Sequence, residues 1–311
     1  MITTRGLTKD FVVNKKTTVH AVRGINLDIG PGELVAVLGP NGAGKTTTMR
    51  MLTTLIAPTA GTATVAGHDV VRAAAEVRRR IGYVGQGNGA AHTQLVGDEL
   101  QVQGRIYGLD RRTAARRADE LLAALDLAEL GKRKVTDLSG GQRRRLDVAI
   151  GLVHAPSLLF LDEPSTGLDP QNRANLWTHI QRMRAEFAMT IVLTTHYLDE
   201  ADTMAERVVI VDHGEVIADD TPAALKAKLA GDLLVATGDG PALAPLATAL
   251  PGARDLTVTD AGIEVRVNDG PAALPELVHA AGVHLRTAEV RRPTLDDVFL
   301  ALTGRNLREN S

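Results

Sequence analysis

The sequence predicts an α/β fold, in which buried strands alternate with helices. Two continuous apolar runs, at residues 34–38 and 158–161, are typical of strands that are buried on both faces of a sheet. The first run leads into a glycine-rich loop, and the second ends at two adjacent acids, Asp162 and Glu163. Because ligands bind at the carboxyl ends of the strands in open α/β sheets, both features indicate a binding site at one edge of the sheet.

The other elements of this first part follow in order along the chain. Apolar residues alternate with polar ones at Ile25, Leu27 and Ile29, which predicts a strand. A helix is expected to begin at Lys45 and to end before Pro58, because the residue before a proline disfavours the helical conformation. Further strands are expected at 62–65, 80–84, 190–195 and 207–212, with a helix at 170–187 and a hairpin turn at His213-Gly214.

Two changes in composition indicate the domain organisation. Residues from about 95 to 154 are rich in Ala, Leu, Arg and Glu and contain no proline, which predicts a helical subdomain at about 90–154 inside a first domain of residues 1–230. Near residue 231 the chain becomes rich in Ala, Pro and Gly, so residues 231–311 are expected to form a small α+β domain that closes with a helix from Thr294. Its elements follow the split βαβ order of ferredoxin-like domains: strand 233–237, helix 241–250, strands 255–259 and 262–267, helix 271–281 and strand 284–290.

Composition narrows the classes of function. The 311 residues are 44% hydrophobic and 23% charged, and the formal net charge of −2 gives no electrostatic case for nucleic acid as the main partner. The chain has no cysteine, which excludes disulfides and thiolate metal sites. No signal peptide is visible, and the longest central run without Asp, Glu, Lys or Arg, residues 148–161, is too short to span a bilayer. If the protein serves a membrane, another chain must cross it.

The glycine-rich loop at residues 39–46 fits the pattern G-x-x-x-x-G-K-[ST]. Its glycines allow successive backbone N–H groups to point at phosphate oxygens, and Lys45 adds a positive charge near the terminal phosphates. The hydroxyl of Thr46 suits Mg²⁺, which prefers oxygen ligands. The alternative, a flexible loop before an ordinary helix, is disfavoured because a strand precedes the loop and a helix follows it. The residues expected to bind a nucleotide are Gly39, Pro40, Asn41, Gly42, Ala43, Gly44, Lys45, Thr46 and Thr47.

The two acids after the second apolar run complement this loop. Asp162 is expected to hold Mg²⁺, and Glu163 is expected to polarise an attacking water. Adjacent acids after a strand are by themselves more typical of a solvated loop, so this prediction depends on the phosphate loop upstream. His196 ends the strand at 190–195, where an imidazole can bond to a phosphate or to water. A lone histidine in such a place is more often structural.

A second motif, Leu138-Ser139-Gly140-Gly141-Gln142, lies downstream of the phosphate loop. With both motifs in this order, the sequence resembles the ATP-binding cassette of ABC transporters, whose signature is LSGGQ. The resemblance implies a P-loop NTPase cassette with a mixed sheet core, an antiparallel β subdomain and a helical insertion, followed by the small C-terminal domain. The tail at residues 292–300 resembles the end of drug-resistance exporter ATPases of the daunorubicin type.

The resemblance also implies roles for individual residues. Asp162 and Glu163 take the places of the Walker B aspartate and the catalytic glutamate, and His196 takes that of the switch histidine. Gln86 matches the glutamine of a loop that reaches Mg²⁺ or the lytic water, although glycines flank it in this sequence. Phe11 resembles the aromatic residue that stacks on adenine, and it could equally fill a core.

The signature implies a dimer. In the family two cassettes pack head to tail, and each signature caps the ATP held by the glycine loop of the other. Ser139, Gly140, Gly141 and Gln142 are therefore expected to bind the ATP of a partner, and Asp169 matches the D-loop that contacts the opposing subunit. The partner is expected to be a second copy or a homologous cassette.

Together these residues imply the ATP-binding and ATP-hydrolysing subunit of an efflux transporter, which exports hydrophobic small molecules or drugs through a separate membrane permease. ATP and Mg²⁺ are the expected cofactors, no nucleic acid is expected as a partner, and the permease is expected to hold the chain at the cytoplasmic side of the cell membrane. The alternatives are a soluble single-cassette ATPase acting on ribosomes or DNA, and a nucleotide-dependent scaffold without turnover. The arginine triplet at 143–145 invites a nucleic-acid interpretation, but acids nearby favour a solvated helix face.

Overall fold

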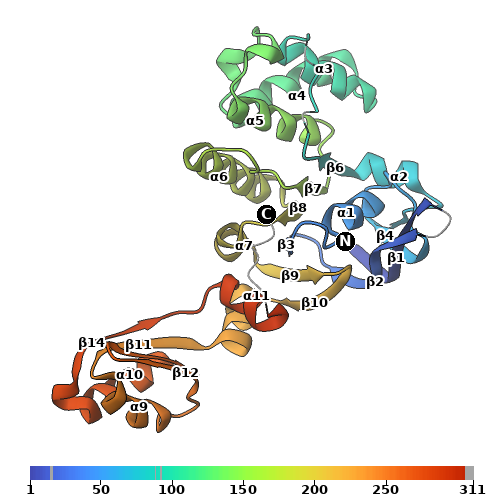
Figure 1. The fold of residues 1–311 in the computed structure, drawn as a ribbon. Helices are drawn as coiled ribbons and strands as arrows, with labels where there is room; N and C mark the ends of the chain where they lie inside the picture. The colour runs from blue at the N-terminus through green and yellow to red at the C-terminus, as the bar shows by residue number, and fades with distance from the viewer. Residues whose placement is uncertain (15–16, 88, 92, 305–311) are drawn as a thin grey trace. The chain divides into compact units, whose positions relative to one another are not determined.

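The computed structural model describes residues 1–14, 17–87, 89–91 and 93–304. The chain forms two compact units, Met1–Ala218 and Asp219–Ser311 (Figure 1). The division falls within β10 (Glu215–Asp220), upstream of the boundary expected after residue 230. Residues up to 230 join the second unit because α8 (Pro222–Leu225) and the helical turn that follows it pack against α11 (Leu295–Thr303).

The centre of the first unit is a six-stranded sheet in the order β10-β9-β3-β8-β7-β6. β3 (Leu34–Leu38) pairs in parallel with β8 (Thr190–Thr195) and β9 (Arg207–Asp212), and β7 (Leu158–Asp162) pairs in parallel with β8 and β6 (Ile81–Val84). Every residue of β3, β7 and β8 is buried, as the continuous apolar runs predicted. Because these strands are parallel, the segments that follow them lie at one edge of the sheet.

The N-terminal part of the chain forms a four-stranded sheet in the order β2-β1-β4-β5. β1 (Ile2–Asn14) pairs antiparallel with β2 (Thr17–Ile29) and with β4 (Ala60–Val65), and β4 pairs antiparallel with β5 (His68–Asp69). The helix α1 (Lys45–Leu52) contacts β2, β4 and β7, so it packs between this sheet and the central one. The antiparallel β subdomain and the helix after the glycine-rich loop are confirmed.

Helices α3 (Val96–Ile106), α4 (Arg111–Ala124) and α5 (Gly140–Leu152) pack against one another and form the expected helical subdomain (Figure 1). Side-chain caps fix where two of them begin. The carboxylate of Asp110 accepts hydrogen bonds from the first backbone N–H groups of α4, and the hydroxyl of Ser139 does the same for α5.

The sequence patterns missed two short helices, α2 (Ala74–Arg80) and α7 (Leu198–Met204). Each has seven residues, which is too short for helical periodicity to stand out. The longer α6 (Pro170–Phe187) lies where it was expected, with a proline in its first turn. The hairpin turn between β9 and β10 is also confirmed, because His213 and Gly214 both have positive φ angles, 47° and 83°.

The second unit contains a four-stranded antiparallel sheet in the order β12-β13-β11-β14. Its strands and helices follow the βαββαβ order of the predicted ferredoxin-like domain. Leu234 and Val265 of the sheet share an apolar core with Leu243 and Leu277 of the helices. The elements are β11 (Asp232–Gly238), α9 (Gly240–Thr248), β12 (Arg254–Thr259), β13 (Gly262–Val267), α10 (Gly270–Ala281) and β14 (Leu285–Arg291).

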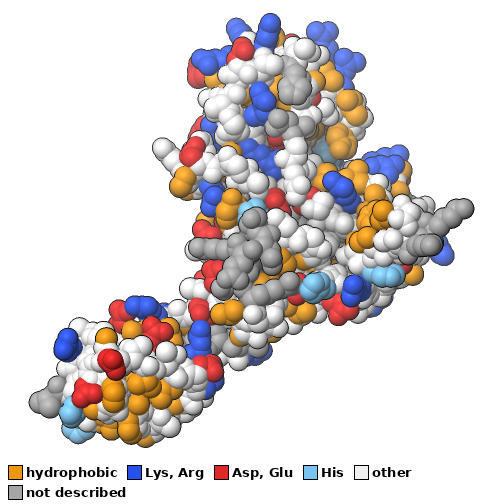
Figure 2. Space-filling view, viewed as in Figure 1, with side chains coloured by type: hydrophobic (Ala, Val, Ile, Leu, Met, Phe, Trp, Pro, Cys, Tyr) orange, Lys and Arg blue, Asp and Glu red, His pale blue; other side chains and the backbone are white. Residues whose placement is uncertain are grey.

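The surface carries charges of both signs. On the face shown in Figure 2, blue Lys and Arg side chains and red Asp and Glu side chains both occur on each unit. Some of them form exposed ion pairs, such as Arg5 with Asp28 at 2.9 Å. Within the described part of the chain, no helix combines the length and the apolar character needed to cross a membrane.

Candidate nucleotide site

A cavity of about 330 Å³ opens at the edge of the central sheet where β3 and β7 end. It brings together the glycine-rich loop, the loop after β6 that contains Gln86 (the glutamine loop, from Gly85 onward) and Glu163 after β7, which are far apart in the sequence. Its lining residues are Val19, Ala21, Asn41, Gly42, Ala43, Gly44, Lys45, Thr46, Thr47, Gln86 and Glu163. Gly39 and Pro40 contribute through their carbonyl oxygens, which bind Lys45.

The loop has a backbone shape that requires glycine. Gly42 and Gly44 have φ angles of 80° and 103°, in the region that other residues rarely adopt. A Cβ atom on Gly44 would also lie only 2.5 Å from the carbonyl oxygen of Ala21, and one on Gly39 only 2.1 Å from that of Val211. The loop therefore presents bare backbone to the cavity, which suits a phosphate cradle.

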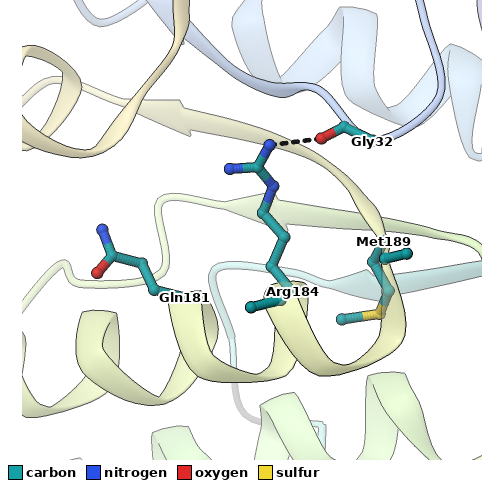
Figure 3. A pocket seen from close by; sticks show the side chains of 6 residues that line it. Gly32, Gln181, Arg184 and Met189 are labelled. Carbon is teal, nitrogen blue, oxygen red and sulfur yellow. Dashed lines mark hydrogen bonds between the residues drawn. The ribbon is translucent and has the colours of Figure 1, made fainter.

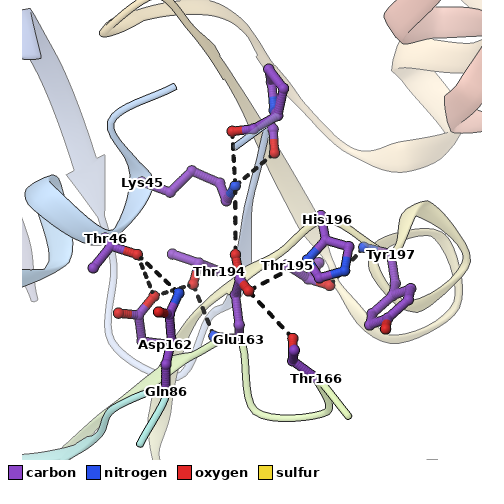
Figure 4. Close-up of polar contacts among 12 residues, drawn as sticks. Lys45, Thr46, Gln86, Asp162, Glu163, Thr166, Thr194, Thr195, His196 and Tyr197 are labelled. Carbon is purple, nitrogen blue, oxygen red and sulfur yellow. Dashed lines mark hydrogen bonds and ion pairs between the residues drawn. The ribbon is translucent and has the colours of Figure 1, made fainter. Parts of the chain in front are cut away.

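Lys45 lies inside this loop, with 4% of its side chain exposed. Its Nζ donates hydrogen bonds to the carbonyl oxygens of Gly39 at 2.7 Å and Pro40 at 3.1 Å, and it lies 3.7 Å from Oε1 of Glu163 (Figure 4). Burial lowers the pKa of Lys45, and the negative charge of Glu163 opposes that shift. Phosphate oxygens make stronger hydrogen bonds to an ammonium group than neutral carbonyl groups do, so the site is suited to exchange one for the other.

Thr46 and Asp162 bring two oxygen atoms together beside Lys45. The hydroxyl of Thr46 donates to Oδ1 of Asp162 at 3.0 Å, and Nε2 of Gln86 donates to the same hydroxyl at 3.4 Å (Figure 4). A hydroxyl and a carboxylate fit Mg²⁺, which takes few protein ligands and keeps several waters. The described residues contain no cluster of three or more His, Asp or Glu side chains that would form an all-protein cage for a metal ion.

Two residues that the sequence analysis missed hold Asp162 in place. The hydroxyl of Thr194 donates to Oδ1 of Asp162 at 2.7 Å and accepts a hydrogen bond from the backbone N–H of Glu163 at 3.0 Å. The hydroxyl of Tyr83 donates to Oδ2 at 3.4 Å, and burial together with the charge of Asp162 raises its pKa, so it remains a donor. β8 also contains Thr190 and Thr195, so no local signal in the sequence singles out Thr194.

Glu163 and His196 face each other at the ends of β7 and β8. Nδ1 of His196 lies 3.4 Å from Oε2 of Glu163, which also accepts a hydrogen bond from the hydroxyl of Thr166 at 3.3 Å (Figure 4). Among the described residues, this buried Nδ1 has no partner in hydrogen-bond geometry. A buried polar nitrogen without such a partner, beside a carboxylate and a cavity, fits a site that a polar ligand completes.

One member of the arginine triplet does not lie on a solvated face. Arg144 is buried, and its guanidinium donates to the carbonyl oxygens of Pro164 at 2.6 Å and Gly85 at 2.7 Å. The expected solvated helix face is therefore wrong for this residue, because consecutive residues of a helix point in different directions. Its neighbours Arg143 and Arg145 bind carbonyl oxygens of the helical subdomain instead.

The signature packs against the D-loop. The hydroxyl of Ser139 accepts from the backbone N–H of Gln142, whose side chain accepts from the N–H of Ser139, so the two form a capping box. Gly141 lies against Asn172, since a Cβ atom on Gly141 would be 2.3 Å from Oδ1 of that residue. Asn172 in turn donates to Asp169, which caps α6. The signature and the D-loop thus form one packed surface.

This surface is separate from the cavity of its own chain. None of the described residues that line the cavity belongs to the signature or the D-loop. Phe11 does not line the cavity either, but it pairs across β1 and β2 with Val19, which does. Phe11 is 40% exposed, so it does not fill a core.

The chain is similar in sequence to known proteins over most of its length. A family described as ABC transporter matches residues 22–166. The daunorubicin resistance ATP-binding protein DrrA3 of Streptomyces coeruleorubidus is 45% identical over 308 residues, which cover 97% of each chain. The chain belongs to the ABC transporter ATPase family. This ABC ATPase is also 40% identical to the doxorubicin resistance ATP-binding protein DrrA of Mycobacterium tuberculosis over 300 residues, 93% of this chain and 90% of that protein.

The fold of the ABC ATPase is that of solved cassettes. A structure described as the dimeric structure of MJ0796, a bacterial ABC transporter cassette, is similar with a TM-score of 0.65 and 25% identity, over 71% of this chain and 98% of that one. The chain is therefore an ABC cassette that binds ATP and catalyses its hydrolysis, and the similar cassette forms a dimer.

A larger cavity of the ABC ATPase, of about 510 Å³, lies away from these residues (Figure 3). Arg184 spans it with a hydrogen bond to the carbonyl oxygen of Gly32, and Gln181 and Met189 line it. It contains none of the predicted site residues, and its wall carries one cation and no acid among the residues described there.

Proposed function

We propose that this ABC ATPase is the ATP-hydrolysing subunit of an efflux transporter that exports hydrophobic small molecules through a separate permease. The observation that carries the proposal is the placement of Lys45, Asp162 and Glu163 around one cavity beside the glycine-rich loop. The cargo class comes from the relatives, whose names state resistance to daunorubicin or doxorubicin.

The glycine-rich loop and Lys45 hold the phosphates of ATP, and Thr46 and Asp162 hold Mg²⁺. The metal ion, when bound, neutralises charge on the phosphates and polarises them toward attack. Thr194 and Tyr83 fix the orientation of the Asp162 carboxylate through their hydrogen bonds.

Glu163 orients and deprotonates the attacking water. Its Oε2 accepts one hydrogen bond from Thr166 and lies beside His196, so the carboxylate is held in one orientation at the cavity. Nδ1 or Nε2 of His196 senses the terminal phosphate or the water from the end of β8. The side-chain amide of Gln86 donates to the hydroxyl of Thr46, which also binds Asp162. A change of the bound nucleotide at Thr46 therefore moves Gln86, and this movement is passed on to the helical subdomain.

The complete site requires two cassettes. The signature residues Ser139–Gln142 lie outside the cavity of their own chain but begin a helix, where backbone N–H groups favour an anion. In a head-to-tail dimer they cap the ATP of the partner, and Asp169 contacts the partner beside them. Phe11 stacks on the adenine ring at the side of the cavity, next to Val19. The partner is a second copy of this chain or a homologous cassette.

The permease supplies the membrane-spanning part and holds the cassettes at the cytoplasmic face of the cell membrane. A cassette acting on ribosomes or DNA is the alternative. It is disfavoured because the chain carries 35 basic and 37 acidic residues, so no strong positive field favours nucleic acid.

The test measures phosphate release from Mg-ATP over a range of protein concentrations, together with the proteins that co-purify with the tagged chain. The proposal expects the specific activity to rise with concentration as dimers form, and a polytopic membrane protein to co-purify. A rate per chain that does not depend on concentration, or capture of ribosomes without a membrane protein, would count against it. The absence of phosphate release from the dimer would favour a scaffold without turnover.

A further inference from the structure

We propose that Arg144 and Asp147, one turn apart on α5, form a clamp that fixes the glutamine loop and the Glu163 backbone relative to each other. Arg144 is then a positioning residue for hydrolysis, acting through Gln86 and Glu163. The inference rests on the roles proposed above for those two residues. It concerns the one arginine of the triplet whose side chain enters the catalytic half of the cassette.

The guanidinium of Arg144 bridges two loops that are far apart in the sequence. Nη1 donates to the carbonyl oxygen of Gly85, directly before Gln86, at 2.7 Å. Nε donates to that of Pro164, directly after Glu163, at 2.6 Å. Nη2 donates to the carbonyl oxygens of Asp162 and Glu163, both at 3.3 Å. One rigid side chain therefore ties the end of β7 to the segment after β6.

Asp147 holds the other side of the glutamine loop. Its Oδ1 accepts a hydrogen bond from the backbone N–H of Gly89 at 2.9 Å, and its Oδ2 lies 3.9 Å from Nη1 of Arg144. Gly85 and Gly89 lie on either side of Gln86, so α5 grips this loop at two points. Only 9% of the Arg144 side chain and 3% of the Asp147 side chain is exposed, so solvent does not screen the pair.

The geometry needs arginine and not merely a positive charge. A guanidinium has five N–H donors in a fixed plane, so it can serve several carbonyl oxygens at once. A lysine carries its donors on one nitrogen, so it cannot reproduce the contacts that three separate nitrogens of Arg144 make. Removing the guanidinium takes this shared donor away from the carbonyl groups of Gly85 and Pro164, which loosens both loops.

The same helix begins at the signature residue Ser139. A displacement of the signature on dimer formation therefore moves Arg144, and with it the backbone next to Gln86 and Glu163. Through the clamp, a movement of the signature at the start of α5 displaces the Glu163 carboxylate of the same chain.

The test compares Arg144→Met with Arg145→Met, a matched control on the same helix. Arg145 donates to the carbonyl oxygen of Leu125 and lies 4.0 Å from the carboxylate of Asp126, and both partners lie outside the two loops. For Arg144→Met we expect kcat for ATP hydrolysis to fall about 10- to 100-fold, with ATP affinity within about twofold of the wild type, because catalytic groups are misplaced but the phosphate loop is intact. Amide hydrogen exchange in ATP-free protein should accelerate in peptides covering 85–91 and 162–166, and should not change there in the control.

Arg144→Lys decides the matter if the methionine variant fails to fold. The clamp expects the lysine variant to lose turnover and to exchange faster at both segments, with the rest of the chain unchanged. If Arg144→Met or Arg144→Lys matches the control in turnover and in exchange, or if only one segment responds, the clamp is wrong. Hydrogen exchange in ATP-free protein tests the clamp without any ATP hydrolysis. The role of Glu163 as the base is tested separately by the turnover of Glu163→Gln, so failure of one proposal is distinguished from failure of the other.

Discussion

The ammonium group of Lys45 lies 3.7 Å from the carboxylate of Glu163, and the side chains are only 4% and 11% exposed. Because both side chains are largely buried, each charge compensates the other, and removal of either partner would leave a buried charge without its compensation. Under the proposed function, phosphates that bind Lys45 would take over that compensation and leave the Glu163 carboxylate to act on water. The pair would then link nucleotide binding to the availability of the proposed base.

The first prediction concerns Glu163→Gln. We expect ATP binding to persist, because the glycine-rich loop and Lys45 are unchanged, and hydrolysis to slow by about 10²- to 10⁴-fold, which is the usual contribution of a general base. An ATP-bound dimer should accumulate, because the step that opens it is blocked. Phosphate release and size-exclusion chromatography with Mg-ATP measure both effects.

Glu186→Gln is the matched control, since it makes the same chemical change on the exposed surface of α6. It should hydrolyse ATP at the wild-type rate. Turnover by Glu163→Gln that approaches the wild type would refute the assignment of Glu163 as the base, whatever happens to the dimer.

The second prediction tests whether the site is shared between two chains. A Lys45→Ala chain lacks the phosphate lysine and a Ser139→Phe chain has a blocked signature, so each alone should be nearly inactive. In a head-to-tail heterodimer of the two, both defects fall in one site and the other site is complete. Random pairing of equal amounts should restore about a quarter of the wild-type rate, if each site works alone.

Phosphate release from the two chains, alone and mixed, measures this effect. Two chains that both carry Lys45→Ala provide the control, because no pairing of them yields a complete site. If the mixture stays as inactive as its parts, either the signature acts within its own chain or the two sites must fire together. Nucleotide binding by each variant separates a blocked signature from a misfolded chain.

The third prediction concerns stability and His154. Nε2 of His154 lies 3.0 Å from the carbonyl oxygen of Ile81 and must donate its hydrogen to it, while the ring stacks on Tyr107 with centroids 3.8 Å apart. Nδ1 is buried and has no hydrogen-bond partner among the described residues. Burial lowers the pKa of His154 below its usual value, so the unfolded chain takes up this proton first. Stability should therefore fall as the pH drops from about 7.5 through the usual histidine value to about 5.5.

Urea unfolding at the two pH values checks this prediction. His154→Gln can still donate to Ile81 but does not titrate, so it should lose less stability than the wild type over the same range. His213→Gln removes an exposed imidazole from the same unit and should behave as the wild type does. An equal pH dependence in the wild type and in His154→Gln would show that this histidine is not the titrating group.

Much of the fold could be predicted because the spacing of apolar residues along the chain matches the burial of these residues in the structure. The apolar runs of β3 and β7 are continuous, and both strands are fully buried, so period and burial pointed to the same answer. The ferredoxin-like order of the second unit followed from short alternating segments between Pro and Gly residues. The short helix α7 was missed because its polar residues carry no clear period.

The partners of the site residues were less predictable. Thr194 binds Asp162 across 32 positions of sequence, and nothing local distinguishes it from the other threonines of β8. The acids near the triplet at 143–145 favoured a solvated helix face, and nothing in the three consecutive arginines sets Arg144 apart. Its acceptors are backbone carbonyl groups of two distant loops, which no side-chain pattern encodes.

Glu163 adopts a left-handed backbone conformation with a φ of 47°. Glycine and asparagine adopt this conformation at lower energetic cost. The carboxylate at this position is therefore kept at the expense of backbone strain. Laboratory evolution that selected only for thermal stability would favour those two residues at this position. If Glu163 is the base proposed above, the resulting variants would be more stable but would no longer hydrolyse ATP. Selection of heat-resistant variants therefore has to include a measurement of ATP hydrolysis as well as of thermal stability.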